Sequence, residues 1–310
     1  MSTHNTTTAK SHADVYQKVT SAIVNAIEQG AGSWKLPWNR SGKFAFSPIN
    51  VTTKKPYRGL NIVALWAVAQ TKGYERGEWA TYAQWQERGA QVRKGEKSAS
   101  VAFWKFADGS AESQDGDPND LASSSRSRLL FCREYHVFNA AQVDGYDPKP
   151  DATTSVEQRI EQAETFFSAI NARVCHQGNR AFYSPSDDSI TLPPFAAFHT
   201  PLDYYSTRAH ETGHWTSKAD RCNRELGKRF GDNAYAMEEL VAELSAAFTL
   251  AHLGLSSQPR ADHAAYIDSW LKVLKADKRA IFTASSKAQQ AADYMIERAG
   301  DSARVQGVAA

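Results

Sequence analysis

Apolar residues recur at every fourth position near the beginning of the chain, at Val15, Val19, Ile23 and Ile27, and Gly30 follows them. Side chains four residues apart lie on the same face of an α-helix, and glycine is frequent just after a helix ends. The spacing therefore predicts an amphipathic helix that stops at Gly30.

Two kinds of apolar run follow in the first half of the chain. Residues 61–70 are almost continuously apolar and predict a buried helix. Residues 98–106 and 129–138 are rich in Val, Phe, Trp and Tyr and predict two strands. The polar stretch between them, 107–128, predicts a long mobile hairpin loop. The first half should therefore combine helices with strands.

The second half of the chain has a different pattern. Residues 146–155 contain two prolines and predict a linker, after which helical periodicity resumes at 156–170. A short hairpin is predicted within 181–192, and further helices within 236–253 and 259–298. This half should be mainly helical.

The predicted fold class is α+β, with an N-terminal α+β domain at 12–145 and a mainly helical domain at 156–300. Residues 1–11, which are rich in Thr, Ser and His, predict a disordered tail, and residues 301–310 predict a second tail. No apolar run approaches the roughly 20 residues that span a bilayer, and no secretory signal is recognisable. We therefore expect a cytoplasmic protein without membrane contact, whose three cysteines are reduced.

Charge is distributed unevenly along the chain. Residues 1–145 hold 18 Lys and Arg against 13 Asp and Glu, whereas residues 146–310 hold 18 against 21. Five of the acids in the first half lie in residues 107–120, so the rest of that half has a net charge of +10. This excess fits either a polyanionic partner or an ordinary solvated basic face.

Six of the eight tryptophans lie in the same basic half. Single-stranded DNA is bound by exposed rings that stack on bases and by cations that follow the phosphates, so this composition favours single-stranded DNA as the partner. Four tryptophans in predicted helices or strands are expected in the core instead, namely Trp66, Trp79, Trp85 and Trp104. The predicted DNA contacts come from a turn-rich segment and are Trp38, Arg40, Lys54, Lys55, Tyr57 and Arg58.

The strongest chemical signal is the pattern His210-Glu211-Thr212-Gly213-His214. Thr200 and Pro201 begin a helix ahead of it, because a hydroxyl N-cap followed by proline is a typical helix start. His210 and His214 then lie one turn apart on one face and can bind a single zinc ion. Glu211 is the predicted general base, which takes a proton from a metal-bound water.

A catalytic zinc site needs a third protein ligand, and two residues are candidates. Glu239 lies on the second predicted helix, with Glu243 one turn further as a partner that orients a ligand histidine. Asp220, ten residues after His210, is the alternative. Imidazole and carboxylate ligands also suit manganese, cobalt and nickel, so zinc is the expected metal but not the only fit.

Four segments together resemble the ArdC family of antirestriction proteins, whose N-terminal domain is shared with TraC-type plasmid primases: residues 56–61, 135–142, 205–216 and 238–248. The resemblance implies an N-terminal domain that binds single-stranded DNA and a C-terminal zincin-like metallopeptidase domain. It also implies carriage on a plasmid or other mobile element, and protection of incoming DNA from host restriction.

The chain departs from the family pattern just after the histidine helix, where it has Ser217 in place of glycine and Cys222 in place of leucine. Three functions remain open. The protein could be a working metallopeptidase that acts on a host restriction protein or another DNA-bound protein. It could instead bind single-stranded DNA and carry a structural or vestigial metal domain. A third and weaker alternative is a repair protease that acts on crosslinks between DNA and protein.

Overall fold

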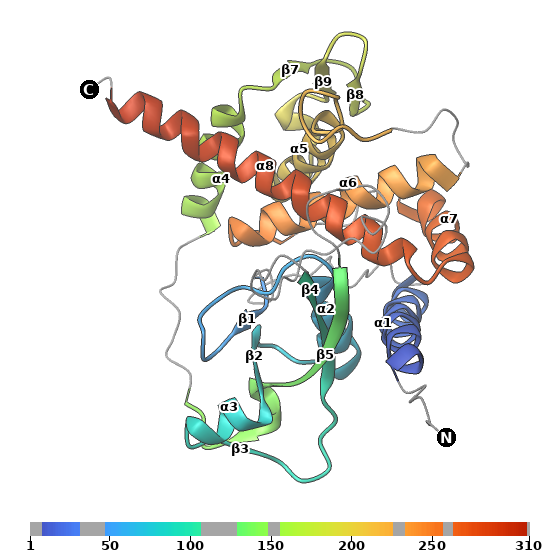
Figure 1. The fold of residues 1–310 in the computed structure, drawn as a ribbon. Coiled ribbons are helices and arrows are strands. Elements are labelled where there is room, and N and C mark those ends of the chain that lie inside the picture. Colours follow the sequence, from blue (N-terminus) through green and yellow to red (C-terminus); the bar gives the residue numbers. More distant parts are fainter. Residues whose placement is uncertain are drawn as a thin grey trace.

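A four-stranded sheet forms the centre of the first half of the chain (Figure 1). The computed structural model describes residues 8–31, 47–106, 129–147, 156–225, 233–256 and 263–308. The elements of the first half are α1 (Thr8–Ala31), β1 (Ile49–Asn50), α2 (Leu60–Lys72), β2 (Glu78–Thr81), α3 (Tyr82–Glu87), β3 (Gln91–Val92), β4 (Ala99–Phe106), β5 (Leu129–Asn139), the 3-10 helix η3 (Ala140–Gln142) and β6 (Val143–Asp144).

The sheet has the strand order β1-β2-β5-β4, in which β1 and β2 are parallel and the other neighbours are antiparallel. β4 and β5 are the two strands predicted from their apolar residues, and they pair from Ala99 opposite Val137 to Phe106 opposite Leu129. The loop predicted at 107–128 lies outside the described residues. A second, two-stranded sheet joins β3 to β6.

Helix α1 is longer than the pattern of apolar residues predicted. It begins at Thr8, inside the stretch assigned to a disordered tail, and it continues through Gly30 to Ala31. A glycine inside a helix costs only about 1 kcal/mol relative to alanine, so one glycine does not end a helix that packing stabilises. The predicted apolar stripe is correct, because Val15, Val19, Ile23 and Ile27 are all buried.

The second half consists of helices and one small sheet (Figure 1). Its elements are α4 (Val156–Ile170), β7 (Arg173–His176), β8 (Phe182–Ser184), β9 (Ser189–Leu192), the 3-10 helix η4 (Phe195–Ala197), α5 (Pro201–Trp215), α6 (Asn233–His252), α7 (His263–Ala276) and α8 (Ala280–Val308). β8 and β9 form the predicted hairpin, and β7 pairs with β9 in parallel.

Helix α8 crosses the whole second half and extends further than expected (Figure 1). The helix runs through Gly300 to Val308, into the segment that the sequence assigned to a tail. Within the described residues, no helix is long and apolar enough to cross a membrane.

The two halves share one hydrophobic core. Its buried residues come from α1, α2, β4 and β5 in the first half and from α6, α7 and α8 in the second. Ring contacts cross between the halves: Tyr16 lies 4.5 Å from Phe282 and Trp66 lies 6.0 Å from Phe248, measured between ring centroids. The four tryptophans expected in the core are all buried there or in the neighbouring cluster around Trp85.

Candidate metal centre

Helix α5 carries the two histidines, and its start is capped as the sequence predicted. The Thr200 hydroxyl accepts a hydrogen bond from the backbone N–H of Asp203, and the Asp203 carboxylate accepts one from the backbone N–H of Thr200. This capping box fixes where the helix begins, with Pro201 as its first residue. His210 and His214 consequently lie one turn apart and face helix α6.

Gly213 allows helices α5 and α6 to pack closely. A Cβ atom at this position would lie 2.5 Å from Ser245 Oγ and 3.2 Å from the backbone of Ala242, both on α6. Only a residue without a side chain leaves room for that approach. The glycine therefore sets how near the carboxylates of α6 come to the histidines of α5.

We expect Gly213→Ala to destabilise the protein by about 1–3 kcal/mol, the usual cost of overpacking a core. Helix α6 would have to move, because backbone atoms of Ala242 cannot rotate away as a side chain can. Urea unfolding and metal content measure the two consequences. Gly300→Ala is the matched control, since nothing lies within 4 Å of its added Cβ, and an equal effect of both substitutions would contradict the packing argument.

Three side chains converge between the two helices. The Nε2 atoms of His210 and His214 are 3.0 Å apart. The Glu239 carboxylate lies against both, with one oxygen 3.4 Å from His210 Nε2 and the other 3.5 Å from His214 Nε2. Ligand atoms of all three residues lie within 4.8 Å of one another. Two imidazoles and one carboxylate are the donor set of many catalytic zinc sites.

The polarity of this cluster fits a cation. His210, Glu239 and their surroundings are buried, and Glu239 Oε2 has no hydrogen-bond partner among the described residues. A buried carboxylate oxygen without a donor is costly, whereas a metal ion would satisfy it together with the two facing imidazoles. The residues present therefore fit a divalent metal ion.

The pKa of His214 shows how strongly a positive charge is favoured here. Burial acts to lower this pKa, but the carboxylates of Glu238 and Glu239 outweigh burial and raise it to about 10. The pKa of Glu239 moves the other way: burial acts to raise it, but the two histidines hold it well below its usual value. A metal ion that binds would displace the proton of His214.

Each histidine also has a second carboxylate next to its Nδ1 atom. His210 Nδ1 lies 3.4 Å from Glu243 Oε2, and His214 Nδ1 lies 3.3 Å from Glu238 Oε1. A carboxylate at Nδ1 holds the ring so that Nε2 faces a metal. Glu243 occupies the place predicted for it.

Glu238, the residue before Glu239, also belongs to this centre. It is buried and accepts two hydrogen bonds from Arg224, at 3.0 Å from Nε and 2.9 Å from Nη2. Arg224 also donates to the Thr216 hydroxyl and to the Gly213 carbonyl oxygen. The turn after α5 thus brings the buried Arg224 side chain against Glu238. The sequence did not predict this contact.

The two other residues predicted for the centre, Glu211 and Asp220, differ in burial and position. Glu211 is buried beside His210. Asp220 is not part of the cluster: its side chain is 68% exposed and lies 3.7 Å from the Arg221 guanidinium. Among the described residues, geometry brings Glu239 and not Asp220 to the two histidines.

The predicted DNA contacts have different surroundings. Lys54 and Lys55 are exposed. Tyr57 is buried, because its ring packs in the shared core, so it presents no face for stacking. Arg58 is ion-paired with Asp293 of α8 and is not a freely extended cation. Trp38 and Arg40 lie outside the described residues.

Each half of the chain matches a known protein family. Residues 13–138 match the N-terminal domain of anti-restriction factor ArdC, and residues 161–287 match a zincin-like metallopeptidase. The crystal structure of the antirestriction ArdC protein from the R388 plasmid, in its Mn(II)-bound form, is 37% identical with a TM-score of 0.72, over 93% of this chain and 99% of that one. The chain belongs to the ArdC family.

This ArdC-family protein is also similar in sequence to two other kinds of protein. The uncharacterized protein y4eC of Sinorhizobium fredii is 46% identical over 96% of both chains. Two DNA primases TraC of Escherichia coli are 36% and 35% identical over 91% of this chain. The chain spans only 20% and 27% of those primases. The metal in the R388 structure agrees with a divalent-metal site in the family.

Proposed function

We propose that this protein is an antirestriction factor of a plasmid or other mobile element, which binds single-stranded DNA and hydrolyses a peptide bond of a DNA-bound host protein. In this proposal residues 12–145 form the DNA-binding unit and residues 156–300 the metallopeptidase unit. The observation that carries it is the convergence of His210, His214 and Glu239, with a carboxylate behind each histidine.

His210, His214 and Glu239 would hold the metal, and zinc is the ion we propose. Three protein ligands, rather than four, are typical of catalytic zinc. The same donors accept manganese, cobalt or nickel, so the metal in the cell also depends on supply. When bound, the ion would activate water and polarise the scissile carbonyl.

The protein's own residues supply the proton transfer. Glu211 lies next to His210 on the same helix and is buried, so its carboxylate can take a proton from water and pass it to the leaving amine. Glu238 and Glu243 keep the two imidazoles in one orientation.

A second candidate is a protein that protects DNA by coating it, with a metal centre that only stabilises the fold. The matches to two primases that are far longer than this chain favour it, because a DNA-handling role is the feature such relatives would share. A repair protease is a third and weaker candidate.

Glu211→Gln distinguishes the first two candidates. We expect the variant to keep its metal and its affinity for single-stranded DNA. Glutamine has nearly the size of glutamate, and position 211 is not one of the three proposed metal ligands. It should lose peptidase activity and the protection of unmodified DNA that enters a restricting cell. Asp220→Asn, an exposed acid outside the cluster, is the matched control. Unchanged protection by Glu211→Gln with intact metal would refute peptide hydrolysis as the means of protection.

A further inference from the structure

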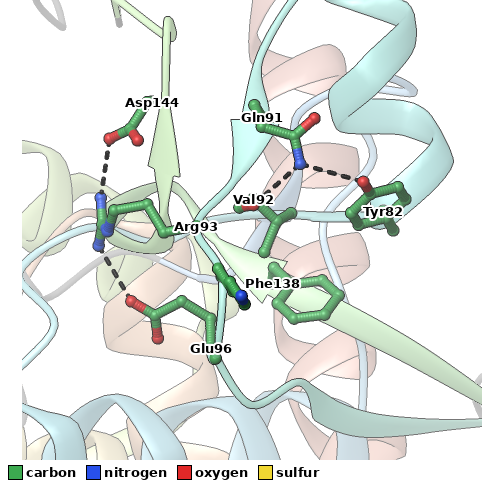
Figure 2. A pocket seen from close by; sticks show the side chains of 9 residues that line it. Tyr82, Gln91, Val92, Arg93, Glu96, Phe138 and Asp144 are labelled. Atoms are coloured by element: carbon green, nitrogen blue, oxygen red, sulfur yellow. Dashed lines mark hydrogen bonds and ion pairs between the residues drawn. The ribbon is translucent and has the colours of Figure 1, made fainter.

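A pocket of about 570 Å³ lies in the first half of the molecule (Figure 2). Residues of β3, the turn after it, the start of α3, β5 and β6 line it. Its size is within the range of about 300–1,000 Å³ that is usual for small-ligand sites. Figure 1 places α3 and β3 at the end of the molecule away from α5 and α6, so this pocket is separate from the metal centre.

Two aromatic rings form one wall of the pocket. Tyr82 is 43% exposed, which is unusual for a large ring in this structure. Its ring meets Phe138 edge to face, with 6.5 Å between the centroids. The Tyr82 hydroxyl accepts a hydrogen bond of 3.0 Å from the Gln91 side-chain amide. An exposed ring that is held in position loses little conformational freedom when a flat ligand stacks on it.

The opposite side of the pocket is polar but electrically balanced. Arg93 contacts the carboxylates of Glu96 and Asp144, as Figure 2 shows, and its guanidinium also reaches two backbone carbonyl oxygens. These partners occupy the Nη1 and Nη2 donors of Arg93. Lys94, also in the lining, is exposed and has no ion-pair partner among the described residues. A phosphate inside would lie near two carboxylates, whereas at Lys94 it would meet a free cation.

We propose that this pocket binds one unpaired base of single-stranded DNA, stacked on Tyr82, with the adjoining phosphate at Lys94. The inference rests on the proposed function, because it names where the DNA is held. A nucleobase is flat, uncharged and polar at its edge, and thus matches an aromatic wall facing a balanced polar one. Glu96, Asp144 and Gln91 offer groups for that edge.

The test is the affinity of the full-length protein for a single-stranded oligonucleotide with one 2-aminopurine, measured by fluorescence. Loss of a stacking ring should weaken binding by about 5- to 150-fold in Tyr82→Ala. Tyr82→Phe keeps the ring and should bind nearly as wild type does. Phe182→Ala is the matched control, because that ring is also exposed but belongs to β8. Metal content should be the same in all four proteins.

Lys94→Ala provides an independent measurement. Affinity should fall, and the slope of log affinity against log salt should become shallower by about one unit, because one phosphate contact is lost. Duplex DNA should not compete, since its bases are not free to enter the pocket.

The possible outcomes separate the two proposals. If the wild type binds single-stranded DNA but Tyr82→Ala and Lys94→Ala bind equally well, the pocket assignment is overturned while DNA binding stands. If Tyr82→Phe loses as much affinity as Tyr82→Ala, the stacking role is refuted. If the wild type does not bind single-stranded DNA, both the pocket and the DNA-binding function are refuted.

Discussion

Glu239→Ala is expected to bind divalent metal at least about 100-fold more weakly than the wild type. Even residues that only orient a ligand change metal affinity by about 10–100-fold when they are replaced, so a direct ligand should have at least the larger effect. In this protein Glu239 supplies the only carboxylate that contacts the Nε2 atoms of both His210 and His214, among the described residues. Its loss leaves two imidazoles, which bind metal poorly by themselves.

Metal titration by calorimetry and elemental analysis of the purified protein measure this effect. Asp220→Ala is the control, since it removes the alternative ligand, and it should leave affinity unchanged. Glu243→Gln should have an intermediate effect, because Glu243 lies behind His210 and does not face the metal. Loss of metal in Asp220→Ala together with retention in Glu239→Ala would show that the loop after α5 rearranges and that the ligand assignment is wrong.

The parts of this centre that sequence predicted follow from spacing within a helix. The pair His210 and His214, and the pair Glu239 and Glu243, each lie one turn apart, so each pair shares a face wherever the helix packs. The capped start at Thr200 is equally local. Predictions of this kind do not need the tertiary structure.

Contacts that the sequence could not predict join segments far apart or depend on how a turn folds. Arg224 reaches Glu238 only because the turn after α5 folds back. Tyr57 is buried by a core that both halves build together. One signal was available for Glu238: its helix is apolar nearly all round, and an acid in such a helix is expected to be buried and paired.

Arg224→Met should lower the free energy of unfolding by about 3–5 kcal/mol, the usual effect of removing one partner from a buried ion pair. Methionine fills a similar volume but leaves the Glu238 carboxylate buried with only His214 as a charged partner. Urea unfolding with a chelator present measures the change without a contribution from bound metal. Lys218→Met is the control, because its ion pair with Asp188 is exposed and should contribute at most about 1 kcal/mol.

The double variant Arg224→Met/Glu238→Leu separates stability from metal binding. Replacing a whole buried ion pair by apolar residues is often neutral, so most of the lost stability should return. Metal affinity should be about 10–100-fold lower than in the wild type, because His214 Nδ1 has then lost the carboxylate that orients it. Recovered stability together with wild-type metal affinity would show that Glu238 only neutralises Arg224. No recovery of stability would show that Arg224 holds the turn through Thr216 and Gly213 instead.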